Sequence, residues 1–290
     1  MEWKPDWGLR GRMVLTVFLL FALYAVFVGV MVFYSGSLLL ATLLLGGFML
    51  VQYFFSDRLA LYSMGAKKVP EDGQYAWLHD TVARLSQQAD VPKPTVAVAD
   101  TSVPNAFATG RSPSNSAVAV TTGLLETLDR DELEGVLAHE LAHVKNRDVM
   151  VMTIASFLST LAFLVVRFGW LFGGRRERSG GVMVAVLVSL VVWVVSFLLI
   201  RALSRYREFA ADRGGAIITG RPSALASALA KIDGRMDKVP NEDMRDAEEM
   251  NAFFVIPIKR GVVGKLFSTH PSTEKRIERL RELERELETA

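Results

Sequence analysis

Four long runs of apolar residues dominate the pattern of hydrophobic and polar positions along the chain. They cover residues 13–33, 38–55, 149–172 and 182–200. Each approaches the roughly 20 apolar residues that an α-helix needs to cross a bilayer. The first two runs are joined by a very short connection, so we expect two membrane hairpins, 13–55 and 149–200. Arg167 lies near the far end of the third run, where its side chain can reach the membrane interface.

The start of the chain has some features of a secretory signal, because a charged segment precedes an apolar run. The run is too long for a signal peptide, lacks an A-x-A-type exit, and leads directly into the next run. We interpret it as an uncleaved anchor, with residues 1–12 forming a short cytoplasmic N-terminus.

Lysines and arginines flanking the runs are divided unequally between the two sides of the predicted membrane. Eleven lie on one side and three on the other, and the richer side faces the cytoplasm. The prediction therefore places both termini and the long polar segments in the cytoplasm. The three basic residues on the other side leave an alternative, in which residues 149–200 form a shallow hairpin that does not cross the membrane. The eleven are Lys4, Arg10, Arg12, Arg58, Lys67, Lys68, Lys145, Arg147, Arg201, Arg205 and Arg207, and the three are Arg175, Arg176 and Arg178.

The polar segments 56–148 and 201–290 are each small for a domain. Together they contain about 180 residues, which is an ordinary domain size. We therefore expect them to fold as one cytoplasmic catalytic domain that the second hairpin splits. Residues 235–268 mix charges, methionine, phenylalanine and glycine without a clear period, and could form a cover over the domain.

Periodicity within these segments predicts an α+β domain. Residues 94–100 and 116–125 alternate in the way typical of strands. The segment between them is rich in Ser, Pro, Asn and Gly and predicts a loop or an irregular edge. Helices are predicted over 71–90 and 223–234, and an amphipathic helix over the C-terminal tail.

Composition narrows the chemistry. Half of the residues are hydrophobic, while the formal charge of +2 implies no polyanion partner and hence no nucleic acid. The absence of cysteine excludes disulfides, thiol catalysis and thiolate metal sites. Any metal must therefore be held by His, Asp or Glu.

Two of the four histidines lie in one helical turn, within the stretch "HELAH". Asp129 and Glu132 predict the start of the helix that carries them. His139 and His143 are four residues apart and share one helix face, so both imidazoles can reach one tetrahedral ion. Glu140 between them is placed to act on a water, as in the H-E-x-x-H arrangement. The alternative is a chance spacing of surface histidines.

A third ligand is suggested by the membrane topology. His143 lies roughly 9 Å above the predicted membrane edge and Glu208 roughly 12 Å, on helices that leave the bilayer on the same side. Glu208 could therefore complete a two-His, one-Glu site, and Asp212, one turn later, could orient a ligand imidazole. The alternative for Glu208 is an exposed glutamate paired with Arg201, Arg205 or Arg207.

Four motifs together resemble the HtpX family of membrane zinc endopeptidases, which are related to the CaaX prenyl proteases. They are "HELAH", "REFAAD" (207–212), "NAFATG" (105–110) and "THPSTEKRI" (269–277), and the similarity extends over nearly the whole chain. The resemblance implies one Zn²⁺ per chain and a zincin-like catalytic domain in a mainly α-helical integral membrane protein. It also implies a prokaryotic plasma-membrane protein with several spans.

The resemblance also implies roles for individual residues. His139, His143 and Glu208 would bind zinc, Glu140 would be the catalytic acid/base, and Asp212 would support a zinc ligand. The downstream pair would lie beside the metal and stabilise the oxyanion, unless it merely begins a helix. An edge strand would pair with substrate backbone. The downstream pair is His270 and Arg276, and the strand residues are Asn105, Ala106, Phe107 and Ala108.

The expected function is hydrolysis of peptide bonds in membrane proteins, particularly misfolded ones, as part of membrane protein quality control. The alternatives are CaaX-type processing of prenylated proteins, an inactive membrane scaffold or chaperone, and a transporter. Transport is disfavoured because the apolar runs carry almost no ionisable residues. The oligomeric state and the choice of zinc over another divalent ion stay open.

Overall fold

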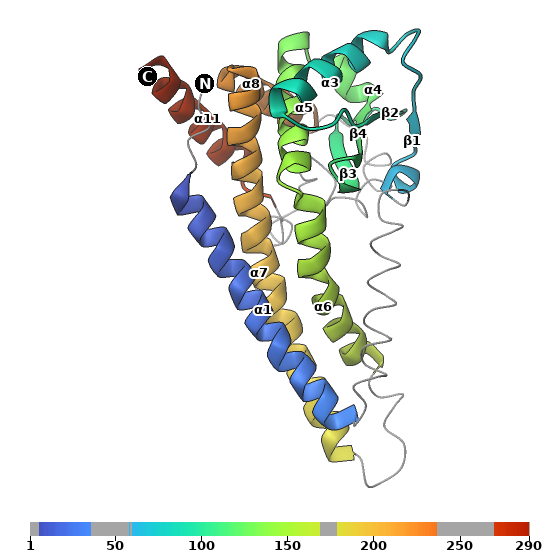
Figure 1. The fold of residues 1–290 in the computed structure, drawn as a ribbon, viewed down its shortest axis with the longest axis vertical. Helices are drawn as coiled ribbons and strands as arrows, with labels where there is room; N and C mark the ends of the chain where they lie inside the picture. Colours follow the sequence, from blue (N-terminus) through green and yellow to red (C-terminus); the bar gives the residue numbers. More distant parts are fainter. Residues whose placement is uncertain (1–5, 36–57, 59, 169–178, 237–269, 290) are drawn as a thin grey trace. The chain divides into compact units, whose positions relative to one another are not determined.

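The computed structural model describes residues 6–35, 58, 60–168, 179–236 and 270–289. These residues group into two compact units (Figure 1). The first is formed by the described residues within Phe55–Met150 and Arg207–Ala290, and the second by those within Pro5–Phe54 and Val151–Tyr206. The predicted domain boundaries at residues 12, 55, 148 and 200 stay a prediction.

The second unit consists of long apolar helices. It contains α1 (Trp7–Ser35), most of α6 (Asp148–Phe168) and the first part of α7 (Ser179–Thr219). Within α1 and α7, the stretches Trp7–Val30 and Met183–Thr219 are long and apolar enough to cross a membrane. Many of their large apolar side chains are exposed, as suits helices surrounded by lipid. These include Val14, Phe18, Phe21, Leu187, Val191 and Leu198.

The four predicted spans agree with the described helices to different extents. The runs 13–33 and 182–200 coincide with the apolar parts of α1 and α7. The run 149–172 overlaps α6, which the structure describes as far as Phe168. The run 38–55, the loop arginines and residues 237–269, which hold most of the predicted cover, lie outside the described residues. The four-span arrangement and its orientation therefore stay a prediction.

Polar side chains join the helices of the second unit. The Tyr24 hydroxyl donates to the carbonyl oxygen of Ala155 at 2.6 Å, which ties α1 to α6. The Ser196 hydroxyl donates to that of Ser159 at 2.8 Å, which ties α7 to α6. Small residues and such hydrogen bonds let apolar helices pack where water supplies no driving force.

The first unit is built on a four-stranded sheet with the order β1-β2-β4-β3. Strands β2 and β4 are parallel, while the β1–β2 and β3–β4 pairs are antiparallel. Among the described residues, β3 is an edge strand that pairs with β4, with Ala108 opposite Val118. The strands are β1 (Ala66–Lys68), β2 (Thr95–Ala99), β3 (Ala106–Ser112) and β4 (Asn115–Thr121).

The predicted strands at 94–100 and 116–125 are confirmed as β2 and β4, although β4 ends at Thr121, where a short helix begins. The prediction of a loop over 101–115 is wrong for β3, and only its alternative of an irregular edge holds. The pairing register of β3 shifts between Gly110 and Ser112, which explains the irregular pattern. Strand β1 has only three residues, too few for alternation to predict it.

The predicted helices of the first unit are present, with α3 beginning five residues later than expected. The helix at the centre is α5, which carries the two histidines. The helices are α3 (Ala76–Ala89), α4 (Thr122–Thr127), α5 (Arg130–Lys145), α8 (Pro222–Met236) and α11 (Thr273–Glu288).

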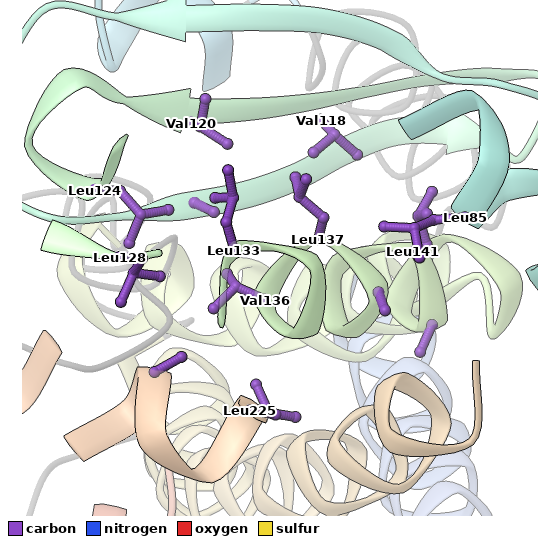
Figure 2. Close-up of a cluster of buried hydrophobic side chains, with 14 of the residues drawn as sticks. Leu85, Val118, Val120, Leu124, Leu128, Leu133, Val136, Leu137, Leu141 and Leu225 are labelled. Carbon is purple, nitrogen blue, oxygen red and sulfur yellow. The ribbon is translucent and has the colours of Figure 1, made fainter. Parts of the chain in front are cut away.

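Helix α5 is buried between the sheet and α8. Figure 2 shows Leu133 and Leu137 pointing from α5 toward Val118 and Val120 of β4, with Leu225 of α8 on the other side of the helix. All five belong to one core cluster, and each buried side chain of this size contributes about 1.5–3 kcal/mol. The helix that carries the histidines is therefore a rigid part of the core.

Glycines allow two helices to approach α5 closely. A Cβ at Gly135 would lie 3.0 Å from the backbone nitrogen of Leu225, so the space beside Gly135 is filled by α8. A Cβ at Gly215 of α7 would lie 2.8 Å from the backbone nitrogen of His139. Gly215 therefore sets how near α7, which carries Glu208, comes to the histidine helix.

We expect Gly215→Ala to lower the free energy of unfolding by about 1–3 kcal/mol, because the added methyl would press on the His139 backbone. The measurement is thermal or denaturant unfolding of the detergent-purified, metal-free protein. Gly234→Ala is the matched control, because nothing described lies within 4 Å of its Cβ position in α8, and alanine there should be neutral or stabilising. If the two variants had the same free energy of unfolding, the close approach of α7 to α5 at Gly215 would be contradicted.

Candidate metal centre

The histidine helix has a fixed beginning. The Asp129 carboxylate accepts from the Glu132 N–H, and the Glu132 carboxylate accepts from the Asp129 N–H, both at 3.0 Å. This is the predicted capping box. Lys231 and Ser227 of α8 also contact Glu132, at 2.6 and 2.7 Å. The helix start is thereby held in place ten residues before His139.

Three ligand atoms converge on one point from α5 and α7. The Nε2 atoms of His139 and His143 are 3.1 Å apart. The carboxylate of Glu208 lies 3.7 Å from the first and 3.5 Å from the second. All three ligand atoms lie within 4.8 Å of one another, as a metal site requires. The alternative of an exposed Glu208 paired with neighbouring arginines is wrong, because this side chain is buried and faces the histidines.

The donor set fits a divalent cation. The Nδ1 atoms of both histidines face carboxylates, His139 that of Asp212 at 3.0 Å and His143 that of Asp148 at 2.6 Å. A proton on each Nδ1 leaves a lone pair on each Nε2. The two Nε2 atoms and the Glu208 carboxylate are then three hydrogen-bond acceptors that face one another. The carboxylate of Glu208 is buried and faces both Nε2 atoms. A cation would satisfy all three groups, and two imidazoles with one carboxylate suit zinc.

Arg276 is the main counter-charge of the site. Its guanidinium donates two hydrogen bonds to Asp212, at 2.9 and 2.7 Å, and lies 3.5 Å from Glu208. Burial lowers the pKa of Arg276, but Asp212 and Glu208 outweigh burial and raise it, so the group stays charged. Only 1% of Arg276 is exposed, so the alternative of a merely solvated arginine is wrong.

His270 reaches the same carboxylate from the segment before α11. Its Nδ1 lies 3.2 Å from Glu208 Oε2. Helix α11 begins two residues later at the N-cap Ser272, whose side chain accepts from the Lys275 N–H. The motif "THPSTEKRI" thus places both His270 and Arg276 beside the third ligand.

Glu140 is buried between the histidine helix and the edge strand. Its carboxylate accepts from the backbone N–H of Ala108 in β3. Burial raises the pKa of Glu140, and the charges of the two nearby histidines oppose that rise. A carboxylate with a raised pKa is suited to taking up a proton and releasing it again.

The predicted substrate strand presents its residues in different directions. Ala106 belongs to the core on the α5 side of the sheet, and Ala108 packs against it, while Phe107 packs with Ala97 on another cluster. Asn105 is fully buried, and its carbonyl accepts from the Thr121 N–H at 2.9 Å. Contact with a substrate would therefore come from the outer backbone edge of β3 rather than from the Phe107 side chain.

A small hollow lies between β3 and the junction of α5 and α6. It borders His143 and is lined on one side by residues 109–112 and Ser116, and on the other by Val144 and residues 147–150. The hollow therefore connects the edge strand with one of the three ligands.

Two residues near the ligands were missed by the sequence analysis. Asp148 contacts His143, and Arg207 lies 3.1 Å from Asp148. Helical spacing could not find Asp148, because α5 ends before it. Arg207 was expected to flank the membrane or to pair with Glu208, and not to contact Asp148. His79 has a structural contact instead, because its Nε2 lies 3.1 Å from the Val69 carbonyl oxygen.

Comparisons with known proteins bear on this site. The sequence profile of Peptidase family M48 matches residues 72–284. "Protease HtpX homolog 2" of Methanosarcina mazei is 55% identical over 291 residues, covering 99% of both chains. "Protease HtpX homolog" of Moorella thermoacetica is 55% identical over 295 residues, covering 98% of this chain and 97% of the other.

A solved structure shares the fold. The crystal structure of S. mikatae Ste24p matches with a TM-score of 0.56 at 18% identity. The match covers 89% of this chain but only 62% of Ste24p, so this chain spans less than two thirds of that protein.

We expect Arg276→Met to lower the free energy of unfolding of the metal-free protein by about 3–5 kcal/mol, because Asp212 and Glu208 would lose their shared buried counter-charge. The measurement is denaturant unfolding after chelator treatment. Arg281→Met, on the exposed face of the same helix, is the control and should change stability by less than about 0.5 kcal/mol. Equal effects of the two substitutions would show that Arg276 is not the counter-charge of the site.

Proposed function

This chain belongs to peptidase family M48 as an HtpX-type metalloprotease, and on that premise we propose a membrane-bound zinc endopeptidase that cleaves misfolded membrane proteins. The observation that supports the proposal best is the convergence of three ligand atoms within 4.8 Å beside a buried glutamate. Such a set would hold a metal on the helix that also carries a buried proton acceptor, Glu140.

The proposed ligands are His139, His143 and Glu208. Zinc, when bound, supplies Lewis acidity that polarises the scissile carbonyl and acidifies water. Glu140 takes the proton of the attacking water and passes it to the leaving amine. The Ala108 N–H holds the Glu140 carboxylate in one orientation between these two transfers.

We assign different roles to the two residues of the downstream pair, Arg276 and His270. The guanidinium of Arg276 is directed at Asp212 and Glu208, so we assign it to ordering these two carboxylates. Asp212 in turn orients His139. His270 then is the member of the pair that donates to the oxyanion that develops during hydrolysis.

The edge strand would bind substrate as an additional strand. Residues Ala106–Ser112 form the edge next to α5, and main-chain pairing there holds an extended peptide largely independently of its sequence. Main-chain pairing of this kind suits an enzyme that accepts unfolded segments of many proteins.

The proposed substrate class follows from location. Two helices of this chain are long and apolar enough to cross a membrane, and the excess of lysine and arginine beside the apolar runs favours a cytoplasmic catalytic unit. We therefore place the protein in the prokaryotic plasma membrane, where cytoplasmic segments of damaged membrane proteins are within reach. Processing of prenylated proteins is the alternative, and the test below includes it.

Glu140→Gln should abolish cleavage of unfolded casein, because the amide cannot accept a proton. Zinc content should stay near one equivalent per chain, since the three ligands are unchanged. Glutamate-to-glutamine replacement of a general base costs on the order of 10²–10⁴-fold in rate. The measurement compares wild type and variant in detergent, with zinc content determined in parallel.

Glu134→Gln is the matched control, because this glutamate lies on the same helix but outside the metal site, paired with Arg84. It should cleave casein like wild type. Chelation should stop cleavage by wild type, and added zinc should restore it. Wild type that binds zinc and cuts only a prenylated peptide would favour CaaX-type processing, and wild type that binds no metal would refute the proposal.

A further inference from the structure

Asp148 is a buried carboxylate that the proposed hydrolysis does not use. Only 1% of it is exposed, although it is the first residue of α6. One carboxylate oxygen lies 2.6 Å from His143 Nδ1, and the other lies 3.1 Å from Arg207 Nε. We propose that Asp148 and Arg207 are positioning residues that fix His143, the second ligand, and its distance to Glu208, the third.

The backbone turn between α5 and α6 brings Asp148 to His143. At about 100° per residue, a continued helix would place residue 148 about 140° around the axis from residue 143, on a different face. Instead α5 ends at Lys145, and Arg147 takes a left-handed conformation with φ 56°. The Arg147 N–H bonds to the Val144 carbonyl at 3.1 Å and closes the turn. This two-residue break places Asp148, the first residue of α6, beside the last turn of α5.

Arg207 fixes the carboxylate from the opposite side. Because each oxygen of Asp148 has its own partner, rotation of the carboxylate would break one contact or the other. Arg207 is also the residue directly before Glu208 on α7. One ion pair therefore connects the ring orientation of His143 with the helix that supplies the third ligand.

The two ligand histidines have matching supports. His139 faces Asp212, which is held by Arg276, and His143 faces Asp148, which is held by Arg207. In both cases a carboxylate favours the proton on Nδ1 and leaves Nε2 as the ligand atom. The supports differ in origin, since Arg276 comes from α11 and Arg207 from α7.

The inference rests on the proposed role of His143 as a metal ligand. Loss of a carboxylate behind a ligand histidine typically weakens metal binding by about 10–100-fold. Asp148→Asn should show that loss, and Asp148→Glu, which keeps the charge, should recover part of it. Arg207→Gln should weaken binding less, because it acts only through Asp148.

The experiment measures the zinc dissociation constant of the full-length protein in detergent by competition with a chromophoric chelator. The visible spectrum of the cobalt-loaded protein reports the geometry around the ion, which a general loss of stability would leave unchanged. Asp131→Asn is the matched control, because Asp131 lies on α5, the helix of His143, and its carboxylate belongs to an exposed pair with Arg221. Unfolding temperatures of the metal-free proteins are recorded for every variant.

The double variant Asp148→Asn/Arg207→Gln separates positioning from the cost of an unpaired buried arginine. If Arg207 acts through Asp148, the double variant should bind zinc within about twofold of Asp148→Asn alone. The inference is overturned if Asp148→Asn binds zinc as tightly as Asp131→Asn, or if the two losses multiply independently. Wild type that binds no zinc would instead overturn the proposed function itself.

Discussion

Burial of charge around the two histidines is the constraint on which the rest of the first unit depends. Glu140, Glu208, Asp212, Asp148 and Arg276 are each no more than 5% exposed. A buried carboxylate without a partner costs several kcal/mol, so each must be paired or hydrogen-bonded. Two other helices supply charged partners for these carboxylates. Arg207 and Glu208 come from α7, and Arg276 comes from α11.

The same constraint explains why the centre needs segments far apart in the sequence. Helix α5 alone supplies two metal ligands. The carboxylate that completes the set, Glu208, lies 65 residues after His143 in the sequence. Close approach of α7 to α5 is possible because Gly215 has no side chain to meet His139. Gly215 thus determines the distance between the two helices, and the ion pairs determine how the side chains between them are oriented.

Local spacing predicted the parts of this centre that lie on regular helices. The capping box at Asp129, the two histidines one turn apart and Asp212 one turn after Glu208 all follow from helical periodicity. Placing Glu208 beside them needed an argument about two helices leaving the membrane together. The positions of His270 and Arg276 followed only from resemblance to a family, because no local pattern relates α11 to α5.

The residues that prediction missed lie where the regular pattern stops. Strand β1 is too short to show alternation, and β3 contains a register shift that hides its period. Asp148 was missed because the left-handed residue Arg147 interrupts the helix after α5, and a spacing rule assumes that the helix continues. The contact between Arg207 and Asp148 depends on that interruption.

The arrangement also explains why the two histidines need support from opposite directions. His139 lies in the interior of α5, where α7 and α11 can both reach it, and its carboxylate therefore comes from another helix. His143 lies in the last turn of α5, beside the residues that follow this helix. Its carboxylate comes from Asp148, directly after the turn, and α7 supplies the arginine, Arg207, that pairs with Asp148. Residues 147–150 also line the hollow between His143 and β3, so the support of this ligand and the shape of the hollow depend on one short segment.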